Sequence, residues 1–377
     1  MTYRRAAMPA LIGGLLLTAL LWWAGSGADA LRLPGGVGTL GPEAVAELQR
    51  WVAPWSYDPP SFLDSGVQGS GYVPLGDGDD RDPYNGIYTA GLQVRYGAVF
   101  VAFVLGALLL IRRLPPKRGR TTAAFLALWV WGAAAGTLAA AVSAPWLIAA
   151  AGHGSHRFLS QLASVTAAGR QLPVAVSLVA AGATVLVARI AAEGAGPLPR
   201  TVVPARAARL AATAGTAVIA LSVVVLSYQP VAAALQAHSP DGGPLAEPGD
   251  LLRQWLLLGA RDAPAGGPVG DRLLHRDSDV LLLAVVWWAL NRLPGLLTRV
   301  TLPAMAAGAV CATVLGLLAS QLLRTAVVQA GPQRGLLHSS VGIGIGIPAA
   351  LTCGLLAGAV ATTVLRLSLR GAPEPAA

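Results

Sequence analysis

The sequence predicts an all-α integral membrane protein with about eight transmembrane helices. Of its 377 residues, 54% are hydrophobic and only 12% are charged, which lies outside the usual range of soluble domains. The hydrophobic residues are grouped into runs near the length of about 20 residues that a helix needs to cross roughly 30 Å of hydrocarbon. We therefore expect spans at residues 8–24, 94–111, 122–151, 171–190, 207–229, 276–293, 300–323 and 340–365.

Basic residues are distributed unevenly between alternate loops. One set of loops and termini holds fifteen of the 27 basic residues and only two acids, Glu193 and Glu374. The other set holds twelve arginines and sixteen acids. Cytoplasmic loops retain positive charge, so both termini are predicted to be cytoplasmic and the long loops to lie outside. Lys117 is the only lysine beside 26 arginines, a bias typical of high-GC bacterial genomes. We expect a multi-pass protein of the bacterial cytoplasmic membrane.

The N-terminus also fits a second interpretation. Arg4 and Arg5, the apolar run that follows them, and the sequence Ala28-Asp29-Ala30 form the pattern of a cleaved secretory signal. Cleavage would leave seven spans and an outside N-terminus. The duplication described next favours retention, because the first span then has a counterpart in the second half.

Two halves of the sequence repeat one plan of spans and loops. The clearest match is 113-RLP-115 against 292-RLP-294, 179 positions apart. The matching loop order favours a parallel 4+4 internal repeat, in which both halves have the same orientation. The predicted units are residues 1–200, with a long outer loop at 25–93, and residues 201–377, with an outer loop at 230–275.

Small residues recur at four-residue spacing in three of the predicted spans. In lipid, such stripes let helix backbones approach closely, within the chain or between two copies. They are thus candidate contacts for helix packing, a homo-oligomer or another protein partner. The glycines of these stripes are Gly132 and Gly136 in the third span, Gly308 and Gly316 in the seventh, and Gly342, Gly346, Gly354 and Gly358 in the eighth.

The outer loops are predicted to carry amphipathic helices. In 42-PEAVAELQRWVAPW-55 a proline suits the first turn, and the apolar residues share one helical face. We expect this helix to lie on the membrane surface with Trp51 and Trp55 at headgroup level. The segment 248-PGDLLRQWLLL-258 is its counterpart in the second half.

Three groups of titratable residues are candidate sites. The carboxylates of 77-DGDDRD-82 (Asp77, Asp79, Asp80 and Asp82) are candidate catalytic acids and could also supply oxygen ligands to Ca²⁺. The glycine and glutamate that an EF-hand loop requires are not at the right positions, so a solvated acidic turn is favoured. His153, His156 and His338 are weak metal-ligand candidates in matching outer loops. Because flanking glycines make a helix doubtful there, no metal or cofactor is assigned.

Asp277 and Asp279 form the third group, at the outer end of the sixth span. A carboxylate at the hydrocarbon boundary needs a partner, and we expect Arg276, Arg170 or Arg324 to supply it. Such a group can act as a general base, bind a cation, or serve as a helix N-terminal charge, which is the default.

Two buried thiols are the remaining reactive groups. Cys311 and Cys353 both lie in the middle of apolar runs at similar depth, so a contact between them is open, and no cysteine lies in an outer loop. The favoured interpretation is two small apolar residues in a helix bundle.

The absence of certain sequence features narrows the range of possible functions. Apart from their ends, the predicted spans contain no Asp, Glu, Lys or Arg, which disfavours an ion-coupled carrier, and no Walker motif is present. The positive charge lies in short loops between spans, so we expect contact with the lipid bilayer and no nucleic-acid partner. These features favour a non-enzymatic subunit, either an envelope-complex scaffold or a permease-like component that passes a small or lipidic molecule between the two halves.

An enzymatic alternative stays open. The acidic outer loop beside an amphipathic helix resembles that of integral-membrane glycosyltransferases that use polyprenyl-linked sugars. The resemblance implies catalytic acids in the first outer loop. In this chain the acids at 77–82 lie near the second span instead of just after the first, and the chain is short for that class.

Overall fold

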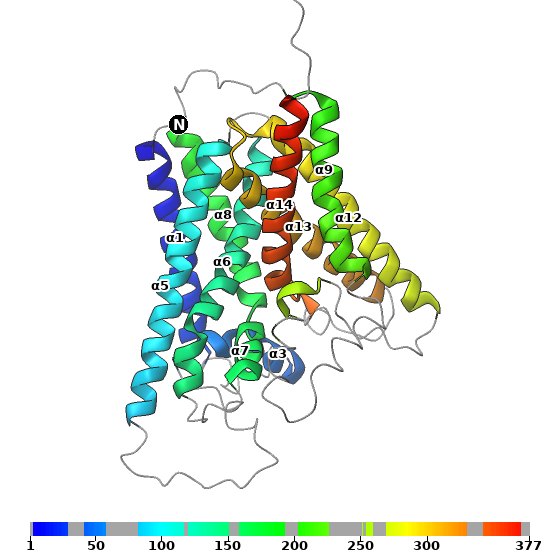
Figure 1. The fold of residues 1–377 in the computed structure, drawn as a ribbon. Coiled ribbons are helices and arrows are strands. Elements are labelled where there is room, and N and C mark those ends of the chain that lie inside the picture. The colour runs from blue at the N-terminus through cyan, green and yellow to red at the C-terminus, as the bar shows by residue number, and fades with distance from the viewer. Residues whose placement is uncertain are drawn as a thin grey trace, which may run out of the picture.

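The protein is a bundle of long helices. The computed structural model describes residues 3–28, 41–57, 82–116, 120–150, 158–192, 203–225, 251, 254–258, 269–329 and 342–370. Within these ranges the chain is helical, without a β-strand. Eight of the described helices are long and apolar enough to cross a membrane, and they run alongside one another (Figure 1). This is the architecture of a multi-pass membrane protein, as the sequence predicts.

Each predicted span overlaps one long helix, and several helices extend beyond the bounds predicted for their spans. The long helices are α1 (Tyr3–Ser26), α5 (Asp82–Arg113), α6 (Thr121–Ala150), α8 (Gln171–Ala191), α9 (Ala205–Ala220), α12 (Val269–Leu296), α13 (Leu302–Gln329) and α14 (Ile347–Arg370). The shorter elements are α3 (Pro42–Val52), the 3₁₀ turn η2 (Ala53–Trp55), α7 (Phe158–Ala167) and the π-helical turn η5 (Leu221–Val225).

The long helices form two groups of four, and each group is a closed ring of neighbours. In the first group, α1 and α6 each contact both α5 and α8. In the second, α9 and α13 each contact both α12 and α14. The groups meet where α6 contacts α13 and α14, and where α5 contacts α13. Because α13 also lies at this junction, 78% of its most apolar stretch is buried.

Glycines bring several of these helices into close contact. A methyl group at Gly358 would lie 2.5 Å from Cα of Ala306, and one at Gly354 would lie 2.7 Å from Cα of Val310. No side chain fits these gaps, so α14 packs directly on the backbone of α13. The same test places Gly308 and Gly316 against α12, and Gly132 and Gly136 against α8.

The predicted stripe of the eighth span is wrong at its first two positions. Gly342 and Gly346 lie in a turn before α14, which begins only at Ile347. Gly344 and Gly346 have φ values of 81° and 86°, a conformation that favours glycine and stops a helix. Gln321 of α13 supports the turn, because its side-chain oxygen accepts a hydrogen bond of 2.7 Å from the Gly344 N–H.

A helix forms at 42–52, and its apolar face turns into the protein instead of lying on a membrane surface. Val52 is 7% exposed and Trp55 only 1%. The indole N–H of Trp55 donates a hydrogen bond of 3.0 Å to the carbonyl of Gly169. Trp55 is therefore packed inside the protein and does not face lipid headgroups. Trp51 is half-buried and donates to Glu47 within the same helix, at 3.0 Å.

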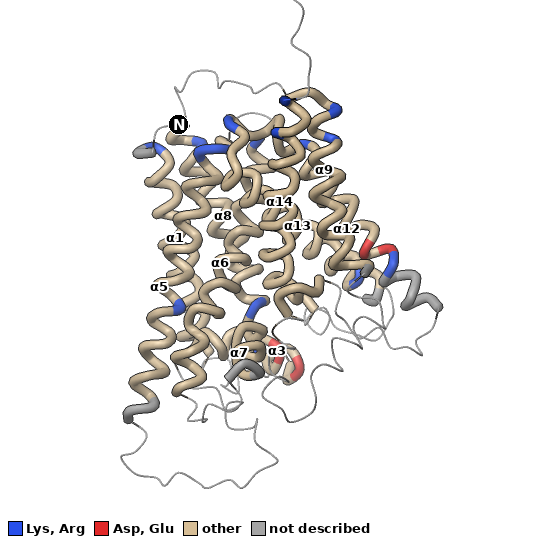
Figure 2. Tube along the Cα trace, viewed as in Figure 1, with Lys and Arg blue, Asp and Glu red and all other residues tan. Residues whose placement is uncertain are grey.

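Charged residues separate along the bundle axis. Most of the described arginines lie at the end where the chain starts and where α5 and α14 finish, whereas the described acids lie toward the other end, on α3 and α12 (Figure 2). We call the first the basic end and the second the acidic end. The separation has the pattern that the sequence predicts for the two sides of a membrane protein.

Candidate functional site

Most of the titratable candidates lie outside the described residues, and the side chain of Asp82, at the start of α5, is not described either. The outlying candidates are Asp77, Asp79, Asp80, His153, His156 and His338. The described part of the chain contains no cluster of three or more His, Cys, Asp or Glu side chains suited to a metal ion.

The carboxylate at the start of the sixth span has an arginine partner, as expected. Arg324 of α13 lies 3.5 Å from the carboxylate of Asp279 on α12. The same guanidinium donates a 2.6 Å hydrogen bond to Ser278, whose side chain is fully buried. Asp277 is exposed. Arg324 thus links α12 to α13 near the acidic end, and this arrangement gives Asp279 a structural role.

A buried arginine that sequence reasoning missed lies inside α5. The predicted second span begins at residue 94, which puts Arg95 at its end, but α5 begins at Asp82. Arg95 is only 1% exposed. The sequence did contain a signal for the burial of Arg95, because it lies on one helical face with apolar and aromatic residues spaced three or four apart. The buried residues of this face are Tyr88, Leu92, Arg95 and Val99.

Arg95 fastens the segment after α3 to the bundle. Its Nε donates a hydrogen bond of 2.9 Å to Ser143 of α6, and its Nη1 donates one of 2.6 Å to the carbonyl of Pro54. Its guanidinium carbon lies 5.4 Å from the ring centre of Trp55. Nη2 is buried and has no hydrogen-bond partner in the described part. Dipoles and an aromatic face therefore stabilise this charge.

Neighbouring tyrosines of α5 bind the same segment. The hydroxyl of Tyr88 donates to the carbonyl of Ser56 at 3.0 Å, and that of Tyr96 donates to the carbonyl of Trp55. The rings of Tyr96 and Trp55 are 6.0 Å apart between centres. Side chains of α5 thus donate hydrogen bonds to the carbonyls of residues 54–56 and fix the segment in place.

A second short segment, residues 254–258, is fixed in the same manner. Ser222 donates a 2.5 Å hydrogen bond to the carbonyl of Leu256, and Thr352 of α14 donates to the carbonyl of Trp255. Gln254 accepts a hydrogen bond of 3.0 Å from Thr166 of α7. Both helix groups therefore bind a loop segment through its main-chain carbonyls.

An apolar cavity of about 320 Å³ lies between the two helix groups and is a candidate ligand site. Its walls come from α5 and α6 of the first group and from α12 and α13 of the second. They consist mainly of Leu and Ala side chains, and no acid lines the cavity. Trp288 on the α12 wall is 55% exposed, so this wall extends to the protein surface.

The cavity runs from the basic end to about the middle of the bundle. Its lining on α13 extends from Ala304 to Leu315, which is about 16 Å at 1.5 Å per residue. This length is roughly half of a 30 Å hydrocarbon core. The lining thus has the depth of a single membrane leaflet.

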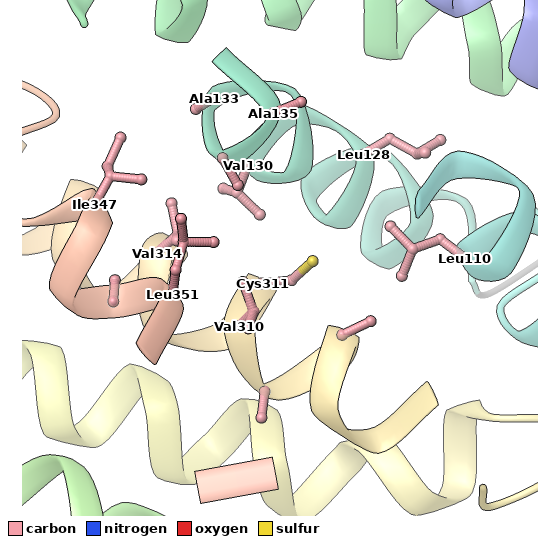
Figure 3. Close-up of a cluster of buried hydrophobic side chains, with 14 of the residues drawn as sticks. Leu110, Leu128, Val130, Ala133, Ala135, Val310, Cys311, Val314, Ile347 and Leu351 are labelled. Atoms are coloured by element: carbon pink, nitrogen blue, oxygen red, sulfur yellow. The ribbon is translucent and has the colours of Figure 1, made fainter. Parts of the chain in front are cut away.

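Cys311 forms part of the cavity wall. Its sulfur turns toward the space between Val130 of α6 and Leu110 of α5 (Figure 3). The thiol donates a weak hydrogen bond of 3.4 Å to the carbonyl of Ala127. Cys353 instead contacts the carbonyl of Leu256, at 3.7 Å, and both thiols are free. The two cysteines thus face different segments.

The two RLP sequences border the basic end of the cavity, the first where α5 ends and the second inside α12. The N–H of Thr298 donates to the carbonyl of Arg113 at 2.9 Å, and Arg120 donates to the carbonyl of Gly295 at 3.2 Å. The first residue of each RLP sequence, Arg113 or Arg292, lines the cavity. The sequence match therefore lies beside a contact between the helix groups, which residue spacing alone could not reveal.

Comparison with known proteins adds no functional information. No protein-family model matches this chain, and neither a curated protein nor a solved structure matches it. The cavity and the residues around it are therefore the features from which a function is inferred.

Proposed function

We propose that this chain is a non-enzymatic, multi-pass protein of the bacterial cytoplasmic membrane that binds a lipidic molecule between its two helix groups. The cavity carries the proposal. Its volume of about 320 Å³ falls within the range of roughly 300–1,000 Å³ typical of ligand sites. Apolar walls do not hold water well, so hydrocarbon is the fitting occupant in a bilayer.

The charge separation supports an orientation for this protein. With the basic end in the cytoplasm, the bundle obeys the positive-inside rule (Figure 2). Both termini are then cytoplasmic, and the cavity opens toward the inner leaflet. Segments 41–57 and 254–258 lie on the outer side.

The helix contacts support an ancestral duplication, with residues 1–200 and 201–377 as the two halves. The rings correspond in chain order, with α1 matching α9, α5 matching α12, α6 matching α13, and α8 matching α14. The cavity walls then come from equivalent helix pairs, α5 and α6 against α12 and α13. A site between duplicated halves is the common location in permease-like proteins.

The depth of the cavity favours a protein that holds a lipidic ligand over one that conducts it across the membrane. Because its lining covers about half of the hydrocarbon thickness, the ligand enters from one leaflet, as in a permease-like component with its site open to one side. The enzymatic alternative draws no support from the described residues, since its acids at 77–80 lie outside them.

Lipid retention tests the proposal. The chain is purified in mild detergent, and the bound lipid per protein is measured by mass spectrometry. Ala123 of α6 lines the cavity and Ala149, on the same helix, is exposed away from it. We expect Ala123→Phe to fill the cavity and lose most of the bound lipid, and Ala149→Phe to retain it. Equal retention by both variants, or a wild-type protein without lipid, would contradict the proposal.

A further inference from the structure

Two arginines stand at the basic end of the cavity, one from each helix group. Arg113 is half-buried, and its Nε is buried without a hydrogen-bond partner in the described part of the chain. Arg292 is exposed, and its guanidinium lies over the ring of Trp288, 5.9 Å from the ring centre. Both side chains line the cavity, so two cations border an apolar space.

The cavity offers these arginines no negative charge. None of its lining residues is Asp or Glu. A buried guanidinium N–H without an acceptor is unfavourable, and arginine pairs well with phosphate oxygens in a fork-shaped geometry. The missing partner is therefore best supplied by an anionic ligand.

The apolar part of the same cavity indicates which kind of molecule bears the anionic group. Below the arginines, the lining extends about 16 Å along α13, which is close to the thickness of one leaflet of hydrocarbon. A soluble phosphate would leave this space empty, whereas an acyl chain would fill it. Arg113 and Arg292 therefore lie at the depth of a lipid headgroup, and Cys311 lies at the depth of an acyl chain.

We propose that the cavity is a site for an anionic phospholipid of the inner leaflet. Arg113 and Arg292 bind its phosphate, and one acyl chain lies between α6 and α13. The inference rests on the proposed function, since it names the class of lipid that the cavity takes. It predicts selectivity for charge, which a merely apolar cavity would not show.

Binding of matched lipids tests the inference. Delipidated protein in neutral detergent is titrated with phosphatidylglycerol and with phosphatidylcholine of the same acyl chains, and binding is followed by native mass spectrometry. We expect phosphatidylglycerol to bind about tenfold more tightly, and Arg113→Gln with Arg292→Gln to abolish that preference. Glycerol phosphate, which has no chain, should not compete.

Matched variants separate a site from general surface charge. Arg299 is exposed at the same end and does not line the cavity, so Arg299→Gln should leave the preference unchanged. Arg113→Lys with Arg292→Lys keeps the charge and should retain most of it, which guards against a glutamine variant that fails to fold.

The outcomes distinguish the two proposals. The inference would be overturned if the wild-type protein bound the two lipids with equal affinity and Ala123→Phe bound neither. That result would still support a lipid site in the cavity. Competition by glycerol phosphate, or an equal loss in Arg299→Gln, would also overturn it. If neither lipid binds the wild-type protein, the proposed function itself fails.

Discussion

At the scale of single residues, Arg95 shows how this protein accommodates a charge within a membrane-crossing helix. The guanidinium is buried between α5 and α6, where Ser143 and the carbonyl of Pro54 accept its hydrogen bonds. The face of Trp55 lies nearby. The charge thus stabilises the attachment of a loop segment that Tyr88 and Tyr96 of α5 also bind.

Replacing this arginine should loosen the segment at 41–57. We expect Arg95→Gln to lower the free energy of unfolding by about 2 kcal/mol, the value of hydrogen bonds made by a charged group. It should also expose Trp55 to an aqueous fluorescence quencher. Thermal unfolding in detergent and quenching measure the two effects. Arg276→Gln, at an exposed arginine, is the control. An Arg95→Gln protein as stable as that control would contradict this role.

Residue patterns predicted only part of these contacts. The need of Asp279 for an arginine followed from the cost of a carboxylate at the hydrocarbon boundary, and Arg324 supplies it. Arg95 was not recognised because hydrophobicity marks where the apolar run begins, whereas α5 continues past it. One of the two hydrogen-bond acceptors of Arg95 is the main-chain carbonyl of Pro54 in another segment, which no side-chain pattern encodes.

At the scale of helices, the packing of α14 on α13 depends on the absence of side chains at two glycines. A methyl group at Gly358 would meet the backbone of Ala306, and backbone cannot move aside as a flexible side chain can. The contact lies beside the junction of the two helix groups. Its geometry therefore also positions the α13 wall of the cavity.

Alanine at this glycine should destabilise the protein. We expect Gly358→Ala to lower the free energy of unfolding by about 1–3 kcal/mol, as overpacking does. Gly97 of α5 provides a matched control, because a methyl group there meets no atom within 4 Å. Gly97→Ala should raise stability by up to about 1 kcal/mol through helix propensity alone. Chemical denaturation of both variants measures the difference, and similar effects of the two would contradict close packing of α14 on α13.

Helix positions were largely predictable, and their exceptions have physical causes. Long apolar runs marked all eight spans because the bilayer fixes their length. The turn at 342–346 was not predicted, since four-residue spacing of small residues also fits glycines with positive φ. The burial of Trp55 was missed because an apolar helix face fits a membrane surface and a protein surface equally well.

At the scale of the whole molecule, the two helix groups enclose an apolar space that neither forms alone. The sequence suggested two similar halves through the RLP match, and hydrogen bonds join the two helix groups close to both matched sequences. The cavity itself could not be predicted, because its existence depends on side-chain sizes on four helices at once. The Leu and Ala side chains at the basic end leave a cavity between the helix groups. At Gly354 and Gly358, in contrast, α14 packs against α13 without a gap.

Photo-crosslinking tests the central claim, that lipid occupies this cavity, most directly. A phospholipid with a diazirine near its chain end is incorporated into vesicles with the protein, and crosslinked peptides are identified by mass spectrometry. We expect labelling of α6 within 122–130 and of α13 within 304–315, which Ala123→Phe removes. Labelling confined to outward-facing positions such as Leu178 and Leu186 of α8, both exposed, would contradict it.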